Sequence, residues 1–429
     1  MMNALKRRDF LTRVGGGAAA LLAATSWPAS ALAQGRSRVV IVGGGFGGAT
    51  CAKYLRRADP TIAVTLIERE PHYVTGPMSN AVIGGLRSLD DITVSYDELI
   101  DRYGVNLIQG NVVAIDAVAK SVTLDRGDTL AYDRLVVAPG IDSVYTAIDG
   151  YGTEVTERMP HAWQPGPQTL LLRRQIEAMD DGGVVIITIP QMPYRCPPGP
   201  YERASLIAND LKRHKPKSKI LILDANDGFP KQKLFMQGWE ALYPGMIEWV
   251  PGNKGGRVTG VEPETMIVFS EFERYRGDVV NVIPPERAGA IATVAGLTDA
   301  GGWCPVDPRT FESSLQPSIH VIGDAARAGK LPKSGAAANA EGKVCAMALA
   351  ALLNDQPVGD PAFINACYSL LAPDYGISIA AVFGLTTQGI MPLPDASGTS
   401  PVEASQKYRR KEAEDAQGWY DSIVADTFA

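Results

Sequence analysis

Residues 38–68 read RVVIVGGGFGGATCAKYLRRADPTIAVTLIE, and this stretch decides the fold of the amino-terminal half. A β-branched strand enters a glycine-rich turn, a helix-like segment follows, and a second strand ends on Glu68, which is the order of a βαβ unit. The turn has a G-x-G-x-x-G pattern at Gly43, Gly45 and Gly48: these glycines permit a tight turn, admit a pyrophosphate and let the helix pack closely. We therefore predict a dinucleotide site, with Glu68 accepting hydrogen bonds from ribose hydroxyls.

Two later segments extend this prediction from a dinucleotide to FAD. YDRLVVAPG, which ends on Gly140, and IHVIGD, which ends on Gly323 and Asp324, are similar to two strands of the glutathione-reductase-like flavoproteins. The resemblance implies that the aspartate hydrogen-bonds the ribityl chain of FAD. Taken singly, Gly-Asp after a strand is also a common turn.

A second strand–helix–strand unit lies between these segments. GGVVIITIP at 182–190 and KILILD at 219–224 have the pattern of buried strands, and the second ends on an acid. The turn after the first strand is rich in proline, from Pro190 to Pro200, and has no G-x-G-x-x-G. Because proline lacks the N–H group that would cradle a pyrophosphate, we expect this unit to be poorly suited to NAD(P)H.

The chain is therefore predicted to be α/β, with two Rossmann-like dinucleotide-binding domains and a carboxyl-terminal interface domain. The FAD-binding domain is split over 36–149 and 287–355, the second Rossmann-like domain occupies 150–286, and the interface domain occupies 356–429. The net charge of −6 is spread without long single-sign runs. It therefore gives no support for nucleic-acid binding or for a simple anionic-membrane anchor.

Residues 1–33 resemble a twin-arginine export signal. KRRDFL at 6–11, an apolar stretch from Val14 to Ala24 and the small-residue site Ala31-Leu32-Ala33 follow one another in the expected order. An ordinary helix with a basic start and an uncleaved anchor are the alternatives. We expect export to the periplasm with cleavage near Ala33. No later stretch of about twenty apolar residues is evident, so no membrane span is expected in the mature protein.

Cysteine is the candidate redox residue. Cys196 lies where the first strand of the second unit ends, in the region where open α/β sheets gather ligands, and just before a helix whose N-terminus stabilises a thiolate. The spacing leaves the cysteine pairing open, and a structural disulfide is a full alternative in an exported protein. Cys51 and Cys345 lie in apolar helical stretches and are expected to be buried hydrophobes, whereas Cys304 stays unassigned.

Two other cofactor types are not expected in this chain. No Cys-x-x-Cys-His segment is present, so no c-type haem is attached by that motif. The four histidines are scattered without a metal-ligand spacing, at His72, His161, His214 and His320.

Five segments resemble the flavoprotein subunit of flavocytochrome c sulfide dehydrogenase. They are YRCPPGPYERAS (194–205), IPPERAG (283–289), GWCPVD (302–307), CYSLLAP (367–373) and GWY (418–420). The resemblance implies that Cys196 and Cys367 form a redox disulfide on one face of the flavin, that Glu202 handles protons nearby, and that Trp419 lies against the flavin. The plainer alternatives are a structural disulfide, a helix-terminal acid and a core aromatic residue.

This resemblance implies a sulfide dehydrogenase. Hydrosulfide would attack the disulfide, giving a persulfide and a thiolate. Sulfur would leave as zero-valent sulfur or polysulfide, and FAD would pass electrons to a cytochrome subunit or a soluble cytochrome c. One alternative is a sulfide:quinone oxidoreductase, which the mixed charges of residues 405–429 disfavour as a membrane-docking end. The other is a redox-inactive FAD-binding partner protein.

The chain departs from the family at one place. The family commonly attaches FAD through a cysteine in a Tyr-x-x-Cys-x-x-Ser-Asn-like segment, whereas HYVTGPMSN at 72–80 has Gly76 at that position. We therefore expect FAD to be bound non-covalently.

Overall fold

The computed structural model describes residues 37–429, so the predicted export signal lies outside the described residues. The first sheet is parallel throughout and confirms the βαβ prediction. Its strands, in spatial order, are β20 (Ile319–Val321), β9 (Arg134–Val137), β1 (Arg38–Val42), β2 (Ala63–Glu68) and β5 (Asn106–Gln109). The strand from the late segment pairs with β9 at the sheet edge, so the sheet is assembled from two distant parts of the sequence.

Glycine allows the helix α2 (Phe46–Ala58) to start directly above this sheet. Gly43 has a left-handed φ of 98°, and a Cβ on Gly48 would overlap the carbonyl oxygen of Gly43. Since a side chain at either place would separate helix and strand, the two glycines fix the turn that the sequence predicted.

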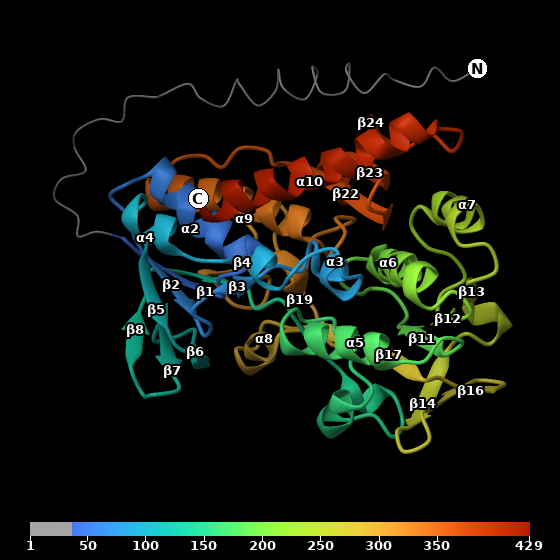
Figure 1. Cartoon of the computed structure of the whole chain (residues 1–429). Helices are drawn as coiled ribbons and strands as arrows, with labels where there is room; N and C mark the ends of the chain where they lie inside the picture. Colours follow the sequence, from blue (N-terminus) through green and yellow to red (C-terminus); the bar gives the residue numbers. More distant parts are fainter. Residues whose placement is uncertain (1–36) are drawn as a thin grey trace.

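A second parallel sheet carries the inserted unit, shown in green and yellow in Figure 1. Its strands, in spatial order, are β13 (Ile247–Val250), β12 (Lys219–Asp224), β11 (Val184–Ile189) and β17 (Val279–Val282). Its helices are α5 (Pro167–Ala178), α6 (Gly199–His214) and α7 (Gln232–Leu242). Both predicted dinucleotide-type units are therefore present, and the fold class is confirmed, while the exact domain boundaries stay predictions.

The third unit is an antiparallel sheet covered by the last helix. Its strands are β22 (Ala362–Ala372), β23 (Tyr375–Thr386) and β24 (Gly389–Thr399). The helix α10 (Gln406–Phe428) runs along the top of the molecule in Figure 1, over α2 and towards the strand ends. β22 packs against α6 of the inserted unit and against α9 of the first, so one strand contacts both dinucleotide-type units.

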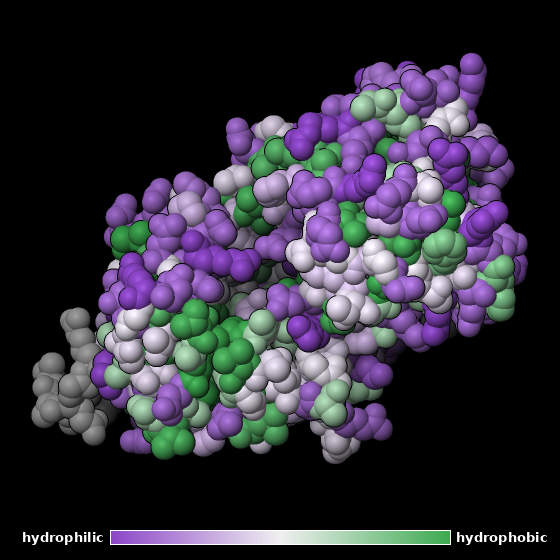
Figure 2. Space-filling view, turned by 90° about the horizontal axis from the view of Figure 1, so that it is seen from below, coloured by the Kyte–Doolittle hydropathy of each residue, from purple (hydrophilic) through white to green (hydrophobic). Residues whose placement is uncertain are grey.

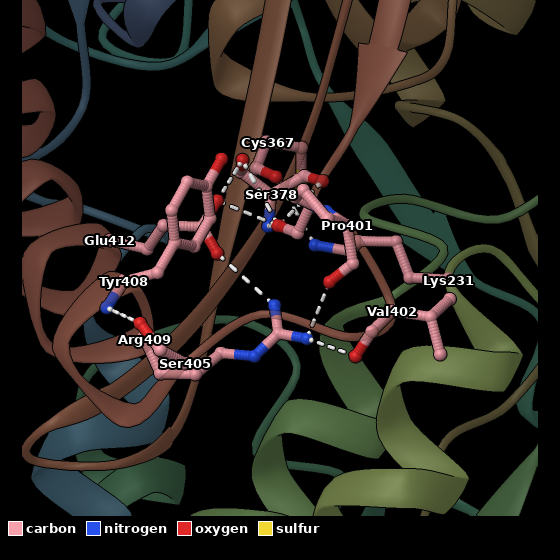
Figure 3. Close-up of polar contacts among 10 residues, drawn as sticks. Lys231, Cys367, Ser378, Pro401, Val402, Ser405, Tyr408, Arg409 and Glu412 are labelled. Atoms are coloured by element: carbon pink, nitrogen blue, oxygen red, sulfur yellow. Dashed lines mark hydrogen bonds and ion pairs between the residues drawn. The ribbon is translucent and has the colours of Figure 1, made fainter. Parts of the chain in front are cut away.

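A buried polar cluster attaches α10 to this sheet. Arg409 and Glu412 are each 1% exposed and form an ion pair. The Glu412 carboxylate accepts hydrogen bonds from the hydroxyls of Ser378 (2.7 Å) and Ser400 (2.6 Å), and Figure 3 shows Glu412 facing Ser378. Buried charges are retained only where they are paired and hydrogen-bonded, so this cluster fixes the helix on the sheet.

The helix α9 (Gly335–Leu353) corrects one sequence expectation. It is a 19-residue helix that is long and apolar enough to cross a membrane by length and composition, although no such stretch was expected. In the fold 61% of that stretch is buried, and the helix packs against α2. Gly342 permits the close approach, because a Cβ there would meet the carbonyl oxygen of Gly47. Its apolar composition therefore serves the protein core.

The remaining elements are short. Those of the first unit are β3 (Tyr73–Val74), α3 (Ser79–Ile83), β4 (Thr93–Val94), α4 (Asp97–Asp101), β6 (Val112–Asp116), β7 (Ser121–Leu124), β8 (Thr129–Ala131), α8 (Ala290–Val294), β19 (Cys304–Pro305) and β21 (Ala326–Arg327). The inserted unit adds the antiparallel β14 (Val258–Glu262), β15 (Ile267–Ser270) and β16 (Arg274–Arg276). Where the chain passes between the two units, β10 (Ile141–Ser143) pairs with β18 (Glu286–Ala288). Figure 2 shows a hydrophobic patch among hydrophilic side chains on the face seen from below.

Candidate active site

The predicted dinucleotide cradle lies at the carboxyl end of β1. The N–H of Gly44 donates to the Glu68 carboxylate at 2.6 Å, so the acid at the end of β2 stands beside the glycine turn. The Tyr96 hydroxyl donates to the Gly44 carbonyl at 3.1 Å and supports the turn from the other side. Gly45 immediately precedes α2, whose N-terminus favours an anion. These residues fit the pyrophosphate and adenosine ribose of FAD.

Asp324 lies at the end of β20, as predicted. Its Oδ1 atom is buried and has no hydrogen-bond partner among the described residues, which is the arrangement expected where a ligand hydroxyl completes the bonding. Burial raises the pKa of this carboxyl, and the nearby Arg195 and Lys333 oppose the rise. Gly140 has a left-handed φ of 66° at the end of β9 and accepts a hydrogen bond from Gly289 N–H. The set fits the ribityl chain of FAD.

Glu341, on α9, is a buried acid that the sequence did not single out. It is 3% exposed, and its Oε2 accepts the N–H of Gly323 at 2.6 Å. Burial raises its pKa to about 8, Asp324 adds to the rise, and the Gly323 N–H and Lys333 oppose it. The glycine before Asp324 is therefore held by a carboxyl that is largely protonated at neutral pH.

The structure brings Cys196 and Cys367 together as free thiols. Cys196 has a left-handed φ of 53° in the turn before α6, and its N–H donates to the carbonyl of Lys333 at 2.7 Å. Cys367 lies within β22. Burial raises the pKa of Cys196, and the next largest contributions are the charges of Cys367 and Glu202. The two thiols, from different units, are thus electrostatic neighbours.

Glu202 bridges three elements around these thiols. Its carboxylate accepts the N–H of Leu370 on β22 at 2.8 Å and the side-chain amide of Asn80 on α3 at 2.9 Å. Burial raises its pKa, while both hydrogen bonds and the cations Lys231 and Arg203 oppose the rise. Its bonds cross from α6 to α3 and β22, so it does more than provide a favourable helix-terminal charge.

Lys231 and Arg203 also belong to the site, although neither was predicted from the sequence. The Lys231 ammonium donates to Cys367 O at 3.1 Å and to Ser369 Oγ at 2.8 Å, and Figure 3 shows it directed at β22. Arg203 is 1% exposed and donates to Asn80 Oδ1 at 3.1 Å and to Asn281 Oδ1 at 2.8 Å. Arg203 lies within segment 194–205, whose resemblance to the family could have indicated it, whereas no sequence motif surrounds Lys231.

The acid at the end of β12 supports the expectation that the second unit does not take NAD(P)H. Asp224 is fully buried, and its carboxylate accepts the Tyr201 hydroxyl at 2.5 Å and the Trp249 indole N–H at 2.9 Å. Tyr201 also stacks on Phe229 with ring centroids 3.6 Å apart. The ribose hydroxyls of a dinucleotide would need these acceptor positions. Because Tyr201 and Trp249 already occupy them, Asp224 is not free to bind a ribose.

The other predicted residues lie in mixed surroundings. Trp419 is half-buried on α10, with its ring 6.2 Å from that of Tyr368, the residue after Cys367. A Cβ on Gly76 would meet no atom within 4 Å. Cys304 is fully buried, and burial raises the pKa of its thiol to about 12, with Lys333 opposing. Cys51 and Cys345 are also fully buried, in the core between α2 and α9, as predicted.

A surface cavity of about 400 Å³ lies where the α3 region, β22 and α10 come together. Met78, Leu370 and Gln417 line it, from the α3 region, β22 and α10. Leu370 also donates its N–H to Glu202. Leu370 therefore links the cavity lining to the acid that neighbours the thiols.

Three family profiles match consecutive parts of the chain. Residues 37–165 match Pyridine nucleotide-disulphide oxidoreductase, and residues 169–284 match Sulfide dehydrogenase (flavocytochrome c) flavoprotein chain, central. Residues 359–428 match Flavocytochrome c sulphide dehydrogenase, flavin-binding. The matches cover the early segment of the first unit, the inserted unit, and the unit that carries β22 and α10, while residues 285–358 lie outside them.

Relatives point in the same direction. The sulfide dehydrogenase (flavocytochrome c) flavoprotein chain of Chlorobaculum thiosulfatiphilum is 65% identical over 48 residues, which is 11% of this chain and 100% of that sequence. The sulfide-quinone reductase of Aquifex aeolicus (strain VF5) is 29% identical over 184 residues, and that match covers 42% of this chain but only 41% of the relative's own length. The X-ray structure of the sulfide:quinone oxidoreductase from Aquifex aeolicus gives a TM-score of 0.72 at 19% identity, over 91% of this chain and 92% of that one, and shows a shared fold.

The raised pKa of Glu341 predicts a pH dependence of stability. Between its ordinary pKa of 4.5 and the folded value of about 8, the folded protein keeps a proton that the unfolded chain has lost. The contribution of Glu341 to stability therefore falls as pH rises through this window and levels off above it. Glu341→Gln keeps an acceptor for Gly323 without ionising. We expect its stability relative to wild type to grow by an amount on the order of a few kcal/mol from pH 5 to pH 8.5, measured by unfolding at each pH.

The exposed Glu264 supplies the control for this measurement. Glu264→Gln should run parallel to wild type across the same range. A Glu341→Gln curve that also runs parallel to wild type would show that this acid ionises freely in the fold.

Proposed function

The chain belongs to the family of flavocytochrome c sulfide dehydrogenase flavoprotein chains, and from this premise we propose that it oxidises sulfide in the periplasm and passes the electrons to a c-type cytochrome. The observation that carries the proposal is the meeting of Cys196, Cys367 and Glu202 at the contact of α6 with β22. The three residues come from two units, and a purely structural bridge would have no need of the buried acid beside it.

The proposed chemistry at the thiols is disulfide exchange with an inorganic nucleophile. In the oxidised enzyme Cys196 and Cys367 would form one disulfide. The sulfur of HS⁻ forms a bond to one cysteine sulfur while the S–S bond breaks, which leaves a persulfide and a thiolate. The proton of the new persulfide passes to the carboxylate of Glu202, whose pKa is raised by burial. A second sulfide can then remove the outer sulfur of the persulfide as polysulfide.

The chain offers a consistent set of residues to hold FAD. Gly43, Gly45 and Gly48 fit the pyrophosphate, Glu68 fits the ribose hydroxyls, and the unpartnered Oδ1 of Asp324 fits the ribityl chain. When bound, FAD takes up electrons in pairs and releases them singly, which suits a one-electron cytochrome acceptor. Within the protein, Cys196 N–H is bonded to Lys333 O, and the Lys333 ammonium donates to Asp324 O at 2.6 Å. Through Lys333, the turn that carries Cys196 is therefore connected to Asp324 at the expected ribityl site.

A quinone acceptor is the second candidate, because a sulfide-quinone reductase is among the relatives. The mixed charges on α10 argue against membrane docking through that helix: Lys411, Glu414 and Arg410 are all exposed. The twin-arginine-like sequence at residues 1–33 supports a periplasmic site of action. Recovery of the mature protein in the cytoplasmic fraction of its cells would contradict that location.

The thiol pair is tested by replacing each cysteine in turn. Cys196→Ser and Cys367→Ser remove the electrophilic sulfur, so anaerobic sulfide should reduce the flavin slower by orders of magnitude, while flavin content stays near that of wild type. Stopped-flow absorbance of the flavin bands measures the rate.

Cys345→Ala, in the core between α2 and α9, is the matched control and should keep the wild-type rate. NADH serves as a control donor and should leave the flavin oxidised. If sulfide reduced the flavin at a near-normal rate in either serine variant, the cysteine pair would be only a structural bridge. A wild-type flavin that sulfide does not bleach would favour a redox-inactive FAD-binding protein.

The attachment of FAD is tested at Gly76. Because glycine offers no nucleophile, acid precipitation of the wild-type protein should release the flavin into the supernatant. Gly76→Cys places a thiol where the structure leaves open space and should retain part of the flavin on the precipitated chain. Flavin fluorescence on the denatured wild-type polypeptide would show attachment through another residue, and Gly76→Ser is the control without a thiol.

The acceptor is tested by competition between two classes of oxidant. Sulfide-reduced enzyme should transfer electrons faster to a c-type cytochrome than to a soluble ubiquinone analogue at equal concentration. Cytochrome absorbance and quinone absorbance give the two rates. A preference for the quinone would replace the proposed function with the second candidate.

A further inference from the structure

Lys231 is a charged side chain inside the protein without a carboxylate partner. It is 8% exposed, and within residues 37–429 no acid lies within 4.0 Å of its ammonium. Its two hydrogen bonds go to the neutral oxygens Cys367 O and Ser369 Oγ. A buried ammonium is costly unless a nearby anion compensates it. The Glu202 carboxyl acts on Lys231 at longer range without a direct ion pair, so the ammonium is free to compensate a further anion that exists only during part of a reaction.

The backbone at Lys231 is held in an uncommon conformation. Its φ is 62°, in the left-handed region that non-glycine residues rarely adopt. Its carbonyl accepts the N–H groups of Leu234 and Phe235, so the residue opens the first turn of α7. The ammonium lies 5.8 Å from the Phe235 ring centroid. Strain of this kind persists where the surrounding structure fixes it, and here it directs a long side chain to the strand that carries Cys367.

Four charged or titratable groups other than Lys231 act on the two thiols. Arg195, which precedes Cys196, and Arg203, on α6, act on Cys196, as does the Cys367 thiol. Glu202, also on α6, acts on both thiols. For Cys367, burial raises the pKa most, Lys231 opposes the rise more strongly than any other group, and Glu202 adds to it. For Cys196, the charges of Cys367 and Glu202 exceed the effect of Lys231. The two cysteines thus differ in electrostatic surroundings although they are neighbours.

We propose that Lys231 is the positioning cation that stabilises a thiolate on Cys367 and so directs hydrosulfide to the sulfur of Cys196. The proposal rests on the proposed function for its substrate. HS⁻ and the disulfide carry one negative charge in total. A bond forms between the sulfur of HS⁻ and the sulfur of Cys196, while the bond between Cys196 and Cys367 breaks. The negative charge therefore passes to the Cys367 sulfur. The ammonium at Cys367 O then compensates that charge, whereas attack at Cys367 would leave it on Cys196, to which the Lys231 ammonium makes no hydrogen bond among the described residues.

The test measures thiol reactivity, which needs no turnover. The flavin-loaded enzyme is reduced with a phosphine and alkylated with iodoacetamide from pH 5 to pH 11, and peptide mass spectrometry gives the rate at each cysteine. Lys231→Gln should raise the pH midpoint for alkylation of Cys367 by about one to three units, and that of Cys196 by less. Lys231→Arg should stay near wild type because it keeps the charge.

Lys233, exposed two residues away, supplies the matched control, and Lys233→Gln should leave both midpoints unchanged. Lys231→Met, with an apolar stem of similar length, serves if Lys231→Gln loses its flavin, and it should show the same shift. Glu202→Gln should move the Cys367 midpoint downwards, opposite to the lysine variants. The fully buried Cys345 provides an internal reference for unfolding.

The result that overturns the proposal is a Cys367 midpoint that stays at the wild-type value in folded Lys231→Gln or Lys231→Met. An equal shift at both cysteines would also overturn it, since the direction of attack would then not depend on Lys231. Failure of the proposed function is separate: a wild-type flavin that sulfide does not reduce would remove the substrate, yet the alkylation midpoints would still report the charge effect.

Discussion

The hydrogen bond from Cys196 N–H to the carbonyl of Lys333 is the contact on which the site depends. It joins the first turn of the inserted unit to the segment that follows Asp324 in the first unit. Cys196 makes this contact with a left-handed backbone, and Pro197 and Pro198 connect it to the start of α6. A thiol from one unit is thereby fixed beside the expected flavin site of the other, and α6 then carries Glu202 to β22.

The same region concentrates buried charge. Glu202, Asp324 and Glu341 all have a pKa that burial raises, and Lys333 has one that burial lowers. Such a group of perturbed acids and bases is costly for folding and is typical of functional sites. Most of the polar atoms are satisfied by backbone groups of neighbouring units, as in Glu202 with Leu370 and Glu341 with Gly323. Asp324 Oδ1 has no hydrogen-bond partner among the described residues and marks the place where a ligand completes the network.

The inserted unit shows how a dinucleotide fold takes up another task. Its parallel sheet is intact, yet the turn after β11 carries Cys196 in place of a phosphate cradle. The acid that ends β12, Asp224, is bonded to Tyr201 and Trp249 within the core. In a fold of this kind, ligands bind at the carboxyl ends of the strands. The Cys196 thiol therefore lies where a dinucleotide cofactor would otherwise bind.

The sequence by itself determined the local order: the glycine turn, both strand–helix–strand units, Asp324 after a strand, and the family to which the chain belongs. These features depend on contacts between residues close in sequence, or on motifs that can be read directly. Other features depend on contacts between segments that are distant in sequence, and no sequence periodicity predicts them. They are the pairing of β20 with β9, the proximity of Cys196 to Cys367, and the hydrogen bond from Lys231 to β22. The apolar stretch of α9 has the composition of a membrane helix, and only packing against α2 assigned it to the core. Tertiary structure decided these points because burial and charge are properties of the assembled neighbours, not of the segment alone.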